Sequence, residues 1–297
     1  MVGNASRAAI ISDRRITGLS AEVIADLVAE LGPLWHERHQ ARLASCPRKR
    51  AVGAGAKHRL VFVDRLLATL VHLRHATTHD VLACWFGVDR STITRAIAEV
   101  RPLLAERGCT ISPGVRLRTL AEVIDRLGTD GKTGIIDGTE IRVRRPAAGR
   151  RDRDKFISGK NKQNAVKSMV VTGGDGRVLF CSPTKPGSCA DITHARQLGL
   201  VRLLADGPAM EILADAGYQG LGAQTGGRVI TPPHRKFKKN APDWYEEMYE
   251  RQRKEHSSRR IRVEHSIAHL KNWRALTRHL GRREHISHTV QAIAGLL

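Results

Sequence analysis

Apolar positions along the chain follow one period in its first part and another in its second part. Up to about residue 130 they recur every three to four residues, which is the helical period. This spacing predicts helices over 16–44, 60–74, 78–86, from 91 onward, and over 115–127. The segment 46–59 is basic and rich in Gly and Ala, so we expect a loop or arm there. The first part of the chain is therefore predicted to be all-α.

Two of these helices have the arrangement of a helix-turn-helix. Thr78 is a candidate N-cap for a short helix that ends near Phe86, Gly87 supplies the turn, and Ser91 begins the next helix. In this motif the second helix enters the major groove, and its outward N-terminal residues meet DNA. The residues expected to do so are Arg90, Ser91, Thr92, Thr94 and Arg95. The alternative is an ordinary helical hairpin within a bundle.

Short apolar runs replace the helical period after residue 130. They predict a strand at 133–146, a hairpin at 164–183 that turns at Gly-Asp-Gly, and a short strand before Asp215. A helix is expected at 189–205 and further helices towards the end. This order describes a mixed sheet with helices packed on it, which is an α/β domain. We therefore divide the chain into a helical or arm segment (1–56), a helix-turn-helix domain (57–112), a linker helix (113–130) and an α/β domain (131–297).

The net charge of the chain indicates a binding partner. The 297 residues include 50 Lys and Arg against 29 Asp and Glu, a net charge of +21. Such an excess indicates a polyanionic partner, of which nucleic acid is the commonest and an anionic membrane surface the next. No apolar run is long enough to span a bilayer and the start lacks the apolar segment of a signal peptide. The five cysteines show no C-x-x-C pair, so we expect reduced thiols and a cytoplasmic protein.

Acidic residues stand on apolar surfaces of three predicted elements. Asp137 shares a strand face with apolar residues by simple alternation, and Asp215 follows the short strand at its carboxyl end, where α/β sheets bind ligands. Glu264 is expected on the inward stripe of a late helix, with Ile261 and Ile267. An arginine partner would explain any one of these acids. Three acids in one protein suggest a cluster that needs divalent cations, and Mg²⁺ prefers such carboxylates. Two metal ions held there would suit phosphodiester chemistry.

Four sequence blocks, IIDGTEI, KPGSCADITHAR, LADAGYQGL and RRIRVEHSIAHLKNWRAL, resemble the DDE superfamily of insertion-sequence transposases, in its Harbinger-like endonuclease branch. The resemblance implies a ribonuclease-H-like fold for 131–297 and a catalytic, metal-binding triad at Asp137, Asp215 and Glu264. It also implies Mg²⁺ or Mn²⁺, cleavage at terminal inverted repeats, and transfer of the 3′-hydroxyl into target DNA. Asp191 is a second candidate metal ligand, although it is equally placed to cap a helix. Glu140 falls on the opposite strand face to Asp137.

Basic residues beyond the helix-turn-helix are candidates for phosphate contacts. Nine Lys and Arg accompany two acids between 142 and 162, and a second basic stretch begins at 234. The candidates are Arg144, Arg145, Lys160, Lys162, Lys236, Lys238 and Lys239. The alternatives are a solvated surface or ion pairs within a helix, such as Arg260 with Glu264.

The sequence thus predicts a bacterial DNA transposase that acts on double-stranded DNA, both element ends and target, in the cytoplasm at the nucleoid and away from membranes. A homo-oligomer is expected because two element ends must be handled together. Two other functions stay open: a DNA-binding protein without catalysis, and a metal nuclease that cuts DNA but does not join it.

Overall fold

A computed structural model describes residues 9–10, 12–45, 59–236, 241–279 and 281–297. The predicted loop or arm at 46–59 falls almost wholly outside these described residues, and so do Lys238 and Lys239. The N-terminal part of the chain is helical, as predicted. Its elements are α2 (Arg14–Thr17), α3 (Ala21–Ala44), α4 (Phe62–His75), α5 (His79–Phe86) and α6 (Arg90–Glu106).

The start of α3 shows how local chemistry sets a helix boundary. The predicted helix over 16–44 is interrupted because Gly18 adopts a left-handed conformation with φ 81° and ends α2. The Ser20 side chain then accepts a hydrogen bond from the Val23 amide and caps α3.

The predicted helix over 115–127 also begins later than expected. Residues of β1 (Cys109–Ser112) and β2 (Val115–Leu117) pair as an antiparallel hairpin. Helix α7 (Leu120–Thr129) starts only at Leu120, because Thr119 and Glu122 form a capping box there. The predicted linker helix is therefore a hairpin followed by a shorter helix.

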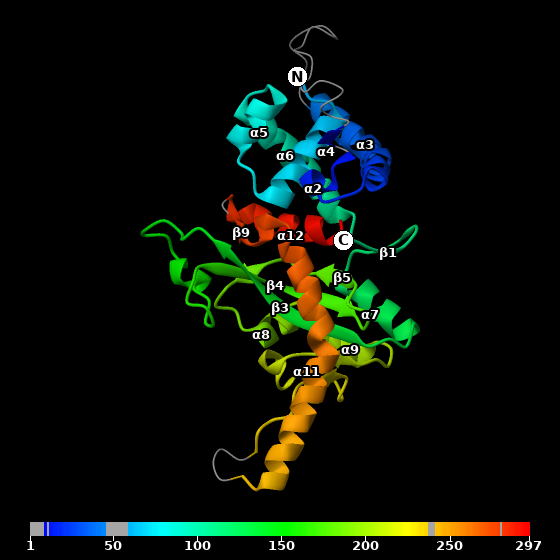
Figure 1. Cartoon of the computed structure of the whole chain (residues 1–297), viewed down its shortest axis with the longest axis vertical. Coiled ribbons are helices and arrows are strands. Elements are labelled where there is room, and N and C mark those ends of the chain that lie inside the picture. Colours follow the sequence, from blue (N-terminus) through cyan, green and yellow to red (C-terminus); the bar gives the residue numbers. More distant parts are fainter. Residues whose placement is uncertain (1–8, 11, 46–58, 237–240, 280) are drawn as a thin grey trace.

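A mixed sheet forms the centre of the molecule (Figure 1). Its strands are β3 (Gly134–Val143), β4 (Ala165–Gly173), β5 (Val178–Cys181), β7 (Ile212–Leu213) and β8 (Val229–Ile230), with the short β6 (Lys185–Pro186) on β4 and β9 (Arg278–His279) on β3. The main path runs β5-β4-β3-β7-β8. The first three strands are antiparallel neighbours, whereas β7 and β8 run parallel to β3. This order and these directions are those of a ribonuclease-H-like sheet, which confirms the predicted fold.

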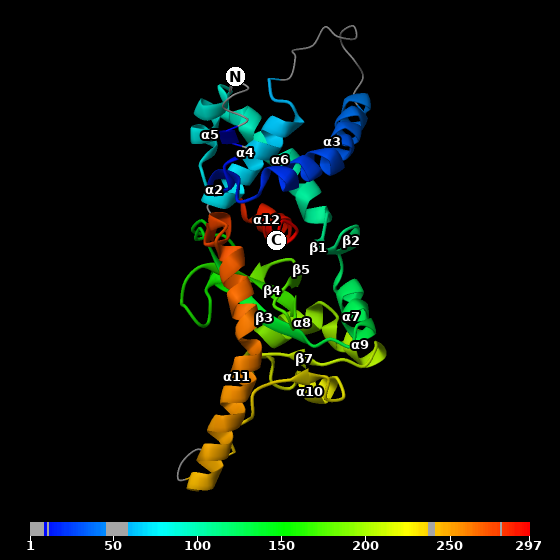
Figure 2. The same cartoon turned by 45° about the vertical axis from the view of Figure 1, so that its right-hand side comes forward.

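Helices cover both faces of the sheet (Figure 2). The long α11 (Asp243–Lys271) crosses one face, where Val263 packs against Ile135 and Leu213. The opposite face carries α7, α8 (Asp191–Gln197) and α9 (Leu200–Asp206), with α10 (Leu221–Gln224) nearby. The helix predicted at 189–205 is thus two helices, because Gly199 has a left-handed φ of 77° between them. Short 3-10 turns lie at η1 (Arg153–Phe156), η2 (Ala216–Tyr218), η3 (Arg274–Leu276) and η4 (Arg283–His285).

The last helix joins the two parts of the molecule. Helix α12 (Ile286–Ala294) lies between the N-terminal helices and the sheet (Figure 1) and packs against α6. Its buried residues belong to one apolar core together with those of α4, α6 and the outer half of β3. The helix-turn-helix is therefore anchored on the α/β part through the C-terminal segment.

Candidate active site

Asp137 is placed by the alternation of β3. Ile135, Ile141 and Val143 on the same face are buried, and Asp137 projects between them with its side chain 19% exposed. Its Oδ1 accepts a hydrogen bond of 2.7 Å from the Gly138 amide. The strand thus fixes a carboxylate in a largely apolar layer, as the sequence pattern predicts.

Asp215 stands beside Asp137 because of the register between parallel strands. Gly134 pairs with Ile212 and Ile135 with Leu213, an offset of 78 residues in both pairs. The same offset separates Asp137 from Asp215, so the register continued by two residues brings the two aspartates to the same level. Asp215 Oδ1 accepts a 2.9 Å hydrogen bond from the Gly217 amide, which begins η2. The two predicted acids therefore meet at the carboxyl end of β7.

Asp191 on α8 comes close to Asp215 from the face of β3 opposite Asp137. A Cβ built on Gly138 would lie 2.8 Å from Asp191 Oδ1. A Cβ on Gly217 would lie 3.0 Å from Asp215 Oδ1 and 3.1 Å from Asp191 Oδ2. Both carboxylates thus come close to one point, and two glycines leave the space that they need. Asp191 is the first residue of α8, whose N-cap is Ala190 without a side-chain cap bond. The alternative of a helix-capping aspartate is therefore wrong.

The three aspartates influence one another electrostatically. Burial raises the pKa of Asp137 to about 6, the nearby Arg260 guanidinium opposes this rise, and the charges of Asp215 and Asp191 add to it. The buried Tyr218 responds to the same field, since burial and then the three carboxylates raise its pKa well above the usual value. In this environment a strong positive charge nearby stabilises the ionised form of Asp137.

Two basic side chains supply positive charge to the acids in the structure. Arg260 on α11 donates from Nη2 to Asp137 Oδ2 at 3.0 Å. Lys167 on β4 places Nζ 3.3 Å from Asp191 Oδ1 and 3.7 Å from Glu140 Oε1. The sequence interpretation missed both residues as partners of the acids. It offered Arg260 only as an ion-pair partner of Glu264, and the structure pairs it with Asp137 instead.

Glu140 lies on the opposite face of β3 from Asp137, as alternation predicts. Its carboxylate accepts hydrogen bonds from Ser158 Oγ at 2.7 Å and from Asn161 Nδ2 at 2.8 Å. Ser158 Oγ in turn accepts from the amides of Lys160 and Asn161. Glu140 therefore holds the 158–161 turn against the sheet, on the side where Lys167 and Asp191 meet.

Glu264 is not on the inward stripe of α11, and that expectation is wrong. Glu264 and Ile261 are exposed, whereas Arg260, Val263 and Leu270 are buried. The rotation of the helix is set by Val263, which packs against the sheet, and by His256, whose Nε2 contacts the Ala214 carbonyl oxygen at 2.9 Å. Glu264 stands one helical turn after Arg260, at the solvent edge of the site.

The donor set fits a divalent cation in its chemistry. Asp137, Asp191 and Asp215 offer carboxylate oxygens from three elements, and hard cations prefer such ligands. Within the described part of the chain, no three His, Cys, Asp or Glu side chains are already arranged to hold one ion together. Two of the three aspartates form ion pairs with basic side chains: Asp137 with Arg260 and Asp191 with Lys167.

The helix-turn-helix is formed as predicted. The Thr78 side chain caps α5, and Gly87 ends it with φ 61°. Of the five residues predicted to meet DNA, Arg90, Ser91, Thr94 and Arg95 are exposed on α6 and Thr92 is half-buried. Behind them Ile93, Ala96 and Ile97 are buried in the helical core. The second helix therefore presents a polar N-terminal face to solvent.

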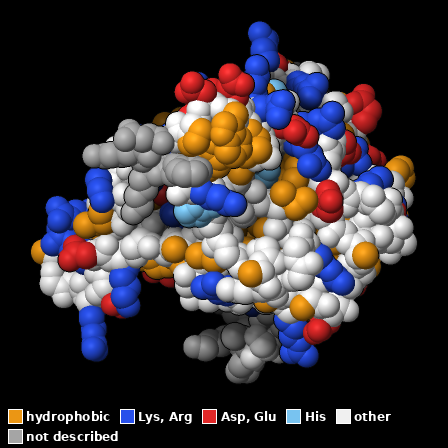
Figure 3. Space-filling view, turned by 90° about the horizontal axis from the view of Figure 1, so that it is seen from below, with side chains coloured by type: hydrophobic (Ala, Val, Ile, Leu, Met, Phe, Trp, Pro, Cys, Tyr) orange, Lys and Arg blue, Asp and Glu red, His pale blue; other side chains and the backbone are white. Residues whose placement is uncertain are grey.

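The predicted phosphate-contacting residues lie at the surface where the structure describes them. Arg144, Arg145, Lys160, Lys162 and Lys236 are exposed. The first four follow β3 or precede β4, beside the turn that Glu140 holds. Seen from below, Lys and Arg side chains project from many parts of the surface with acids among them (Figure 3). The basic charge is thus spread over the molecule and not confined to one patch on that face.

A ribonuclease-H-like sheet with one aspartate on its central strand β3 and another just after the neighbouring β7, linked to a helix-turn-helix, defines a nuclease that binds DNA. Residues 136–297 match the family described as DDE superfamily endonuclease, and residues 58–110 match the helix-turn-helix of DDE superfamily endonuclease. The first match covers more than half of the chain, and the chain belongs to this family. The resemblance deduced from the four sequence blocks is thereby confirmed.

Individual relatives are more distant. The putative transposase for insertion sequence element IS112 of Streptomyces albus G is 29% identical over 229 residues, which cover 76% of this chain and 75% of the relative. Among solved structures, a pre-cleavage Mos1 transpososome aligns with 15% identity over 92% of this chain and 99% of that chain, at a TM-score of 0.21. The Mos1 strand transfer complex aligns with 13% identity over 92% and 98%, at 0.22. TM-scores this low add nothing to the fold assignment, which rests on the sheet topology.

Cys84, Cys109, Cys181 and Cys189 are free thiols, and Cys46 lies outside the described residues. None of the helices in the described ranges has the length and apolar character required to cross a bilayer.

Proposed function

We propose that the protein is a DNA transposase that cleaves DNA at the terminal inverted repeats of its element and transfers the freed 3′-hydroxyl into target DNA. The observation that supports this most directly is the position of Asp137 on β3 beside Asp215, which follows the parallel strand β7, with Asp191 close to Asp215. An aspartate cluster of this kind in a DNA-binding chain suits phosphodiester cleavage.

In this proposal Asp137, Asp215 and Glu264 carry the chemistry and Asp191 assists them. Mg²⁺ or Mn²⁺, held in two sites, would activate the attacking water and stabilise the leaving 3′-oxygen. The protein side chains provide the ligands, and β3 and β7 fix two of them rigidly. Glu264 must turn inward by a change of side-chain conformation, which its exposed position on α11 permits. Arg260 and Lys167 would release Asp137 and Asp191 at the same time and become free to contact DNA phosphates.

DNA would be held at two places. The N-terminal face of α6 would read the element end in the major groove. The exposed cations that flank the sheet, Arg144, Arg145, Lys160, Lys162 and Lys236, would bind the phosphate backbone, together with Lys238 and Lys239. Since two ends must be cut together, we propose a homo-oligomer that acts on chromosomal DNA in the bacterial cytoplasm.

A nicking assay tests the catalytic part of this proposal. The substrate is supercoiled plasmid that carries the DNA flanking the gene, incubated with the full chain and Mg²⁺ or Mn²⁺. The wild type should nick it, and Asp137→Asn and Asp215→Asn should lower nicking at least a hundredfold while binding in a gel-shift assay persists. Equal nicking by the wild type and both variants would overturn the assignment.

One observation favours a second function, DNA binding without catalysis. Arg260 forms an ion pair with Asp137, and the Glu264 side chain is exposed to solvent. This arrangement is expected of a site that does not bind metal ions. In that case the flanking DNA would be bound specifically and no cation would support nicking. A metal nuclease that does not transpose would nick, yet would fail to join a labelled 3′-hydroxyl end to a second duplex, so a strand-transfer assay separates it from the first proposal.

A further inference from the structure

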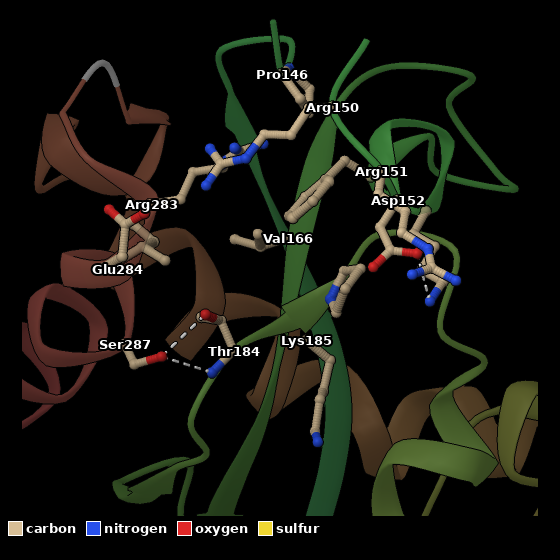
Figure 4. A pocket seen from close by; sticks show the side chains of 14 residues that line it. Pro146, Arg150, Arg151, Asp152, Val166, Thr184, Lys185, Arg283, Glu284 and Ser287 are labelled. Carbon is tan, nitrogen blue, oxygen red and sulfur yellow. Dashed lines mark hydrogen bonds and ion pairs between the residues drawn. The ribbon is translucent and has the colours of Figure 1, made fainter.

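A pocket with a volume of about 530 Å³ lies at the edge of the sheet, outside the group of aspartates. It is enclosed by the 146–156 segment that follows β3, by β4 and β6, and by the η4–α12 junction (Figure 4). This volume falls within the range of roughly 300–1,000 Å³ that is usual for small-molecule sites. The pocket is therefore large enough for one planar ligand with an attached polar group.

The pocket has an apolar wall and a basic rim. Its apolar members are Pro146, Phe156, Val166, Pro186 and Ile286. Its charged members are Arg150, Arg151, Lys155, Lys185 and Arg283, against Asp152 and Glu284. Asp152 is engaged by Lys155 at 2.8 Å. Among the described residues, Arg150, Arg151, Lys185 and Arg283 form no salt bridge of 4.0 Å or less, so the rim keeps an excess of free positive charge.

Arg283 provides the most specific feature. Its guanidinium lies over the Phe156 ring, with Cζ 4.4 Å from the ring centroid. Its Nη1 is buried and has no hydrogen-bond acceptor in the structure. A buried donor without a partner costs free energy, so the position of this guanidinium depends on its contact with the Phe156 ring. The stacked pair thus forms a flat cationic platform at the pocket wall.

The pocket is close to the aspartates through β4. Val166 lines the pocket, and the next residue, Lys167, reaches Asp191 on the other face of the strand. Lys185 pairs with Lys167 across β4 and β6 and extends away from Val166 (Figure 4). Its charge, with that of Lys167, adds to the effect of burial in lowering the pKa of His194 to about 4. Lys185 therefore connects the pocket with the face of the sheet where Asp191 and Glu140 lie.

We propose that this pocket binds one unpaired nucleotide of the DNA strand that enters the active site. The base would stack on the Phe156–Arg283 platform against the apolar wall, and its phosphate would contact Arg150 and Arg151. A base within an intact duplex cannot enter such a concavity, so the ligand is a nucleotide flipped from the stack or one at a single-stranded end. This inference rests on the proposed action on DNA and specifies a part of the strand that the protein would hold.

The test uses binding alone, in EDTA, so that cleavage plays no part. The probes are a single-stranded tetranucleotide that contains 2-aminopurine, whose fluorescence falls on stacking, and a blunt 20-base-pair duplex. The variants are Phe156→Leu and Arg283→Gln, with Arg150→Gln as an exposed substitution that leaves the core intact. Arg202→Gln is the matched control, because Arg202 is 90% exposed on α9 and does not line the pocket.

We expect the wild type to bind the tetranucleotide with quenched fluorescence. Phe156→Leu and Arg283→Gln should each weaken this binding about tenfold and remove the quenching, since one stacked base contributes about 1–3 kcal/mol. Arg150→Gln should weaken it about threefold with the quenching retained, and blunt-duplex binding should change less than twofold in every variant. Arg202→Gln should change neither.

Three results would overturn the proposal. The first is equal weakening of both probes, which would make the pocket a contact for the duplex backbone. The second is competition by inorganic phosphate that matches competition by a deoxynucleoside monophosphate, which would make it an anion site only. The third is quenching that survives both platform substitutions. Because the assay measures binding in EDTA, where no metal-dependent cleavage occurs, failure of the pocket and failure of the proposed catalysis can be told apart.

Discussion

Asp137 on β3 lies near Asp215, which follows the parallel strand β7, because their separation in sequence equals the offset of the β3–β7 pairing. Two carboxylates at one level repel each other, and here the first of them is also largely buried. Its raised pKa, about 6, records both effects, with burial as the larger. The active-site assignment therefore has consequences for stability that can be measured without any DNA.

The stability of the folded chain should fall as pH rises from 4 to 7 through ionisation of Asp137. The usual pKa of an aspartate is 3.8, and that of Asp137 in the folded chain is about 6. Between these values the folded state binds more protons than the unfolded state, so deprotonation favours unfolding. Asp137→Asn removes this titration. Its free energy of unfolding relative to the wild type should therefore increase by on the order of 2–3 kcal/mol between pH 4 and pH 7.

Urea denaturation of both proteins at several pH values without divalent cations measures this difference. Asp206→Asn is a suitable control, because the Asp206 side chain is 72% exposed and sits in a surface pair. A difference between wild type and Asp137→Asn that stays constant with pH would contradict the buried, acid-crowded environment.

Glu264→Gln should abolish nicking and leave stability nearly unchanged. The side chain is exposed, so its substitution should change the free energy of unfolding by no more than about 0.5 kcal/mol. If Glu264 turns inward to complete the site, nicking should fall at least a hundredfold. Glu140→Gln is the informative comparison: it disturbs the bonds to Ser158 and Asn161 and should lower stability, while it retains some nicking. If Glu264→Gln nicks DNA as fast as the wild type, Glu264 does not belong to the proposed triad.

Arg95→Ala should weaken specific binding of the flanking DNA about 5- to 150-fold, the effect of about 1–3 kcal/mol expected for a base-reading arginine. Arg95 is exposed on α6, and its hydrogen bond to Thr92 Oγ1 is long at 3.4 Å, so the side chain is free to reach a groove. Competition against unrelated DNA measures the specific part. Arg202→Ala provides the control, and equal loss on specific and unrelated DNA would reduce Arg95 to a phosphate contact.

The pattern of the sequence predicts those features that depend on local period. Alternation along β3 predicts the face on which Asp137 lies. Thr78 and Gly87 predict the bounds of α5 and the start of α6 to within one or two residues. Glu264 could not be placed in this way, because α11 carries apolar residues on more than one side and only the packing of Val263 decides its rotation. The proximity of Asp137 to Asp215 depends on the register between β3 and β7. The approach of Asp191 to β3 depends on the absence of a side chain at Gly138. Both are relations between distant segments, which no local pattern contains.

The ion pair between Arg260 and Asp137 should stabilise the fold in a way that depends on pH. Both side chains are mostly buried, 10% and 19% exposed, so Arg260→Gln leaves a buried carboxylate without its partner. We expect a loss of on the order of 1–3 kcal/mol at pH 8, where Asp137 is ionised, and a smaller loss at pH 5, where it is mostly protonated. The adjacent Arg259→Gln is a matched control, because Arg259 pairs with Glu211 at 3.3 Å on the surface, with both side chains about half exposed. That pair should contribute less than about 1 kcal/mol at either pH.

Denaturation at the two pH values, with and without Mg²⁺, separates the two roles of Arg260. If Arg260 stands where a cation would bind, added Mg²⁺ should stabilise Arg260→Gln more than the wild type. Equal losses at pH 5 and pH 8, or no difference between the two variants, would show that Arg260 acts through packing and not through the charge of Asp137.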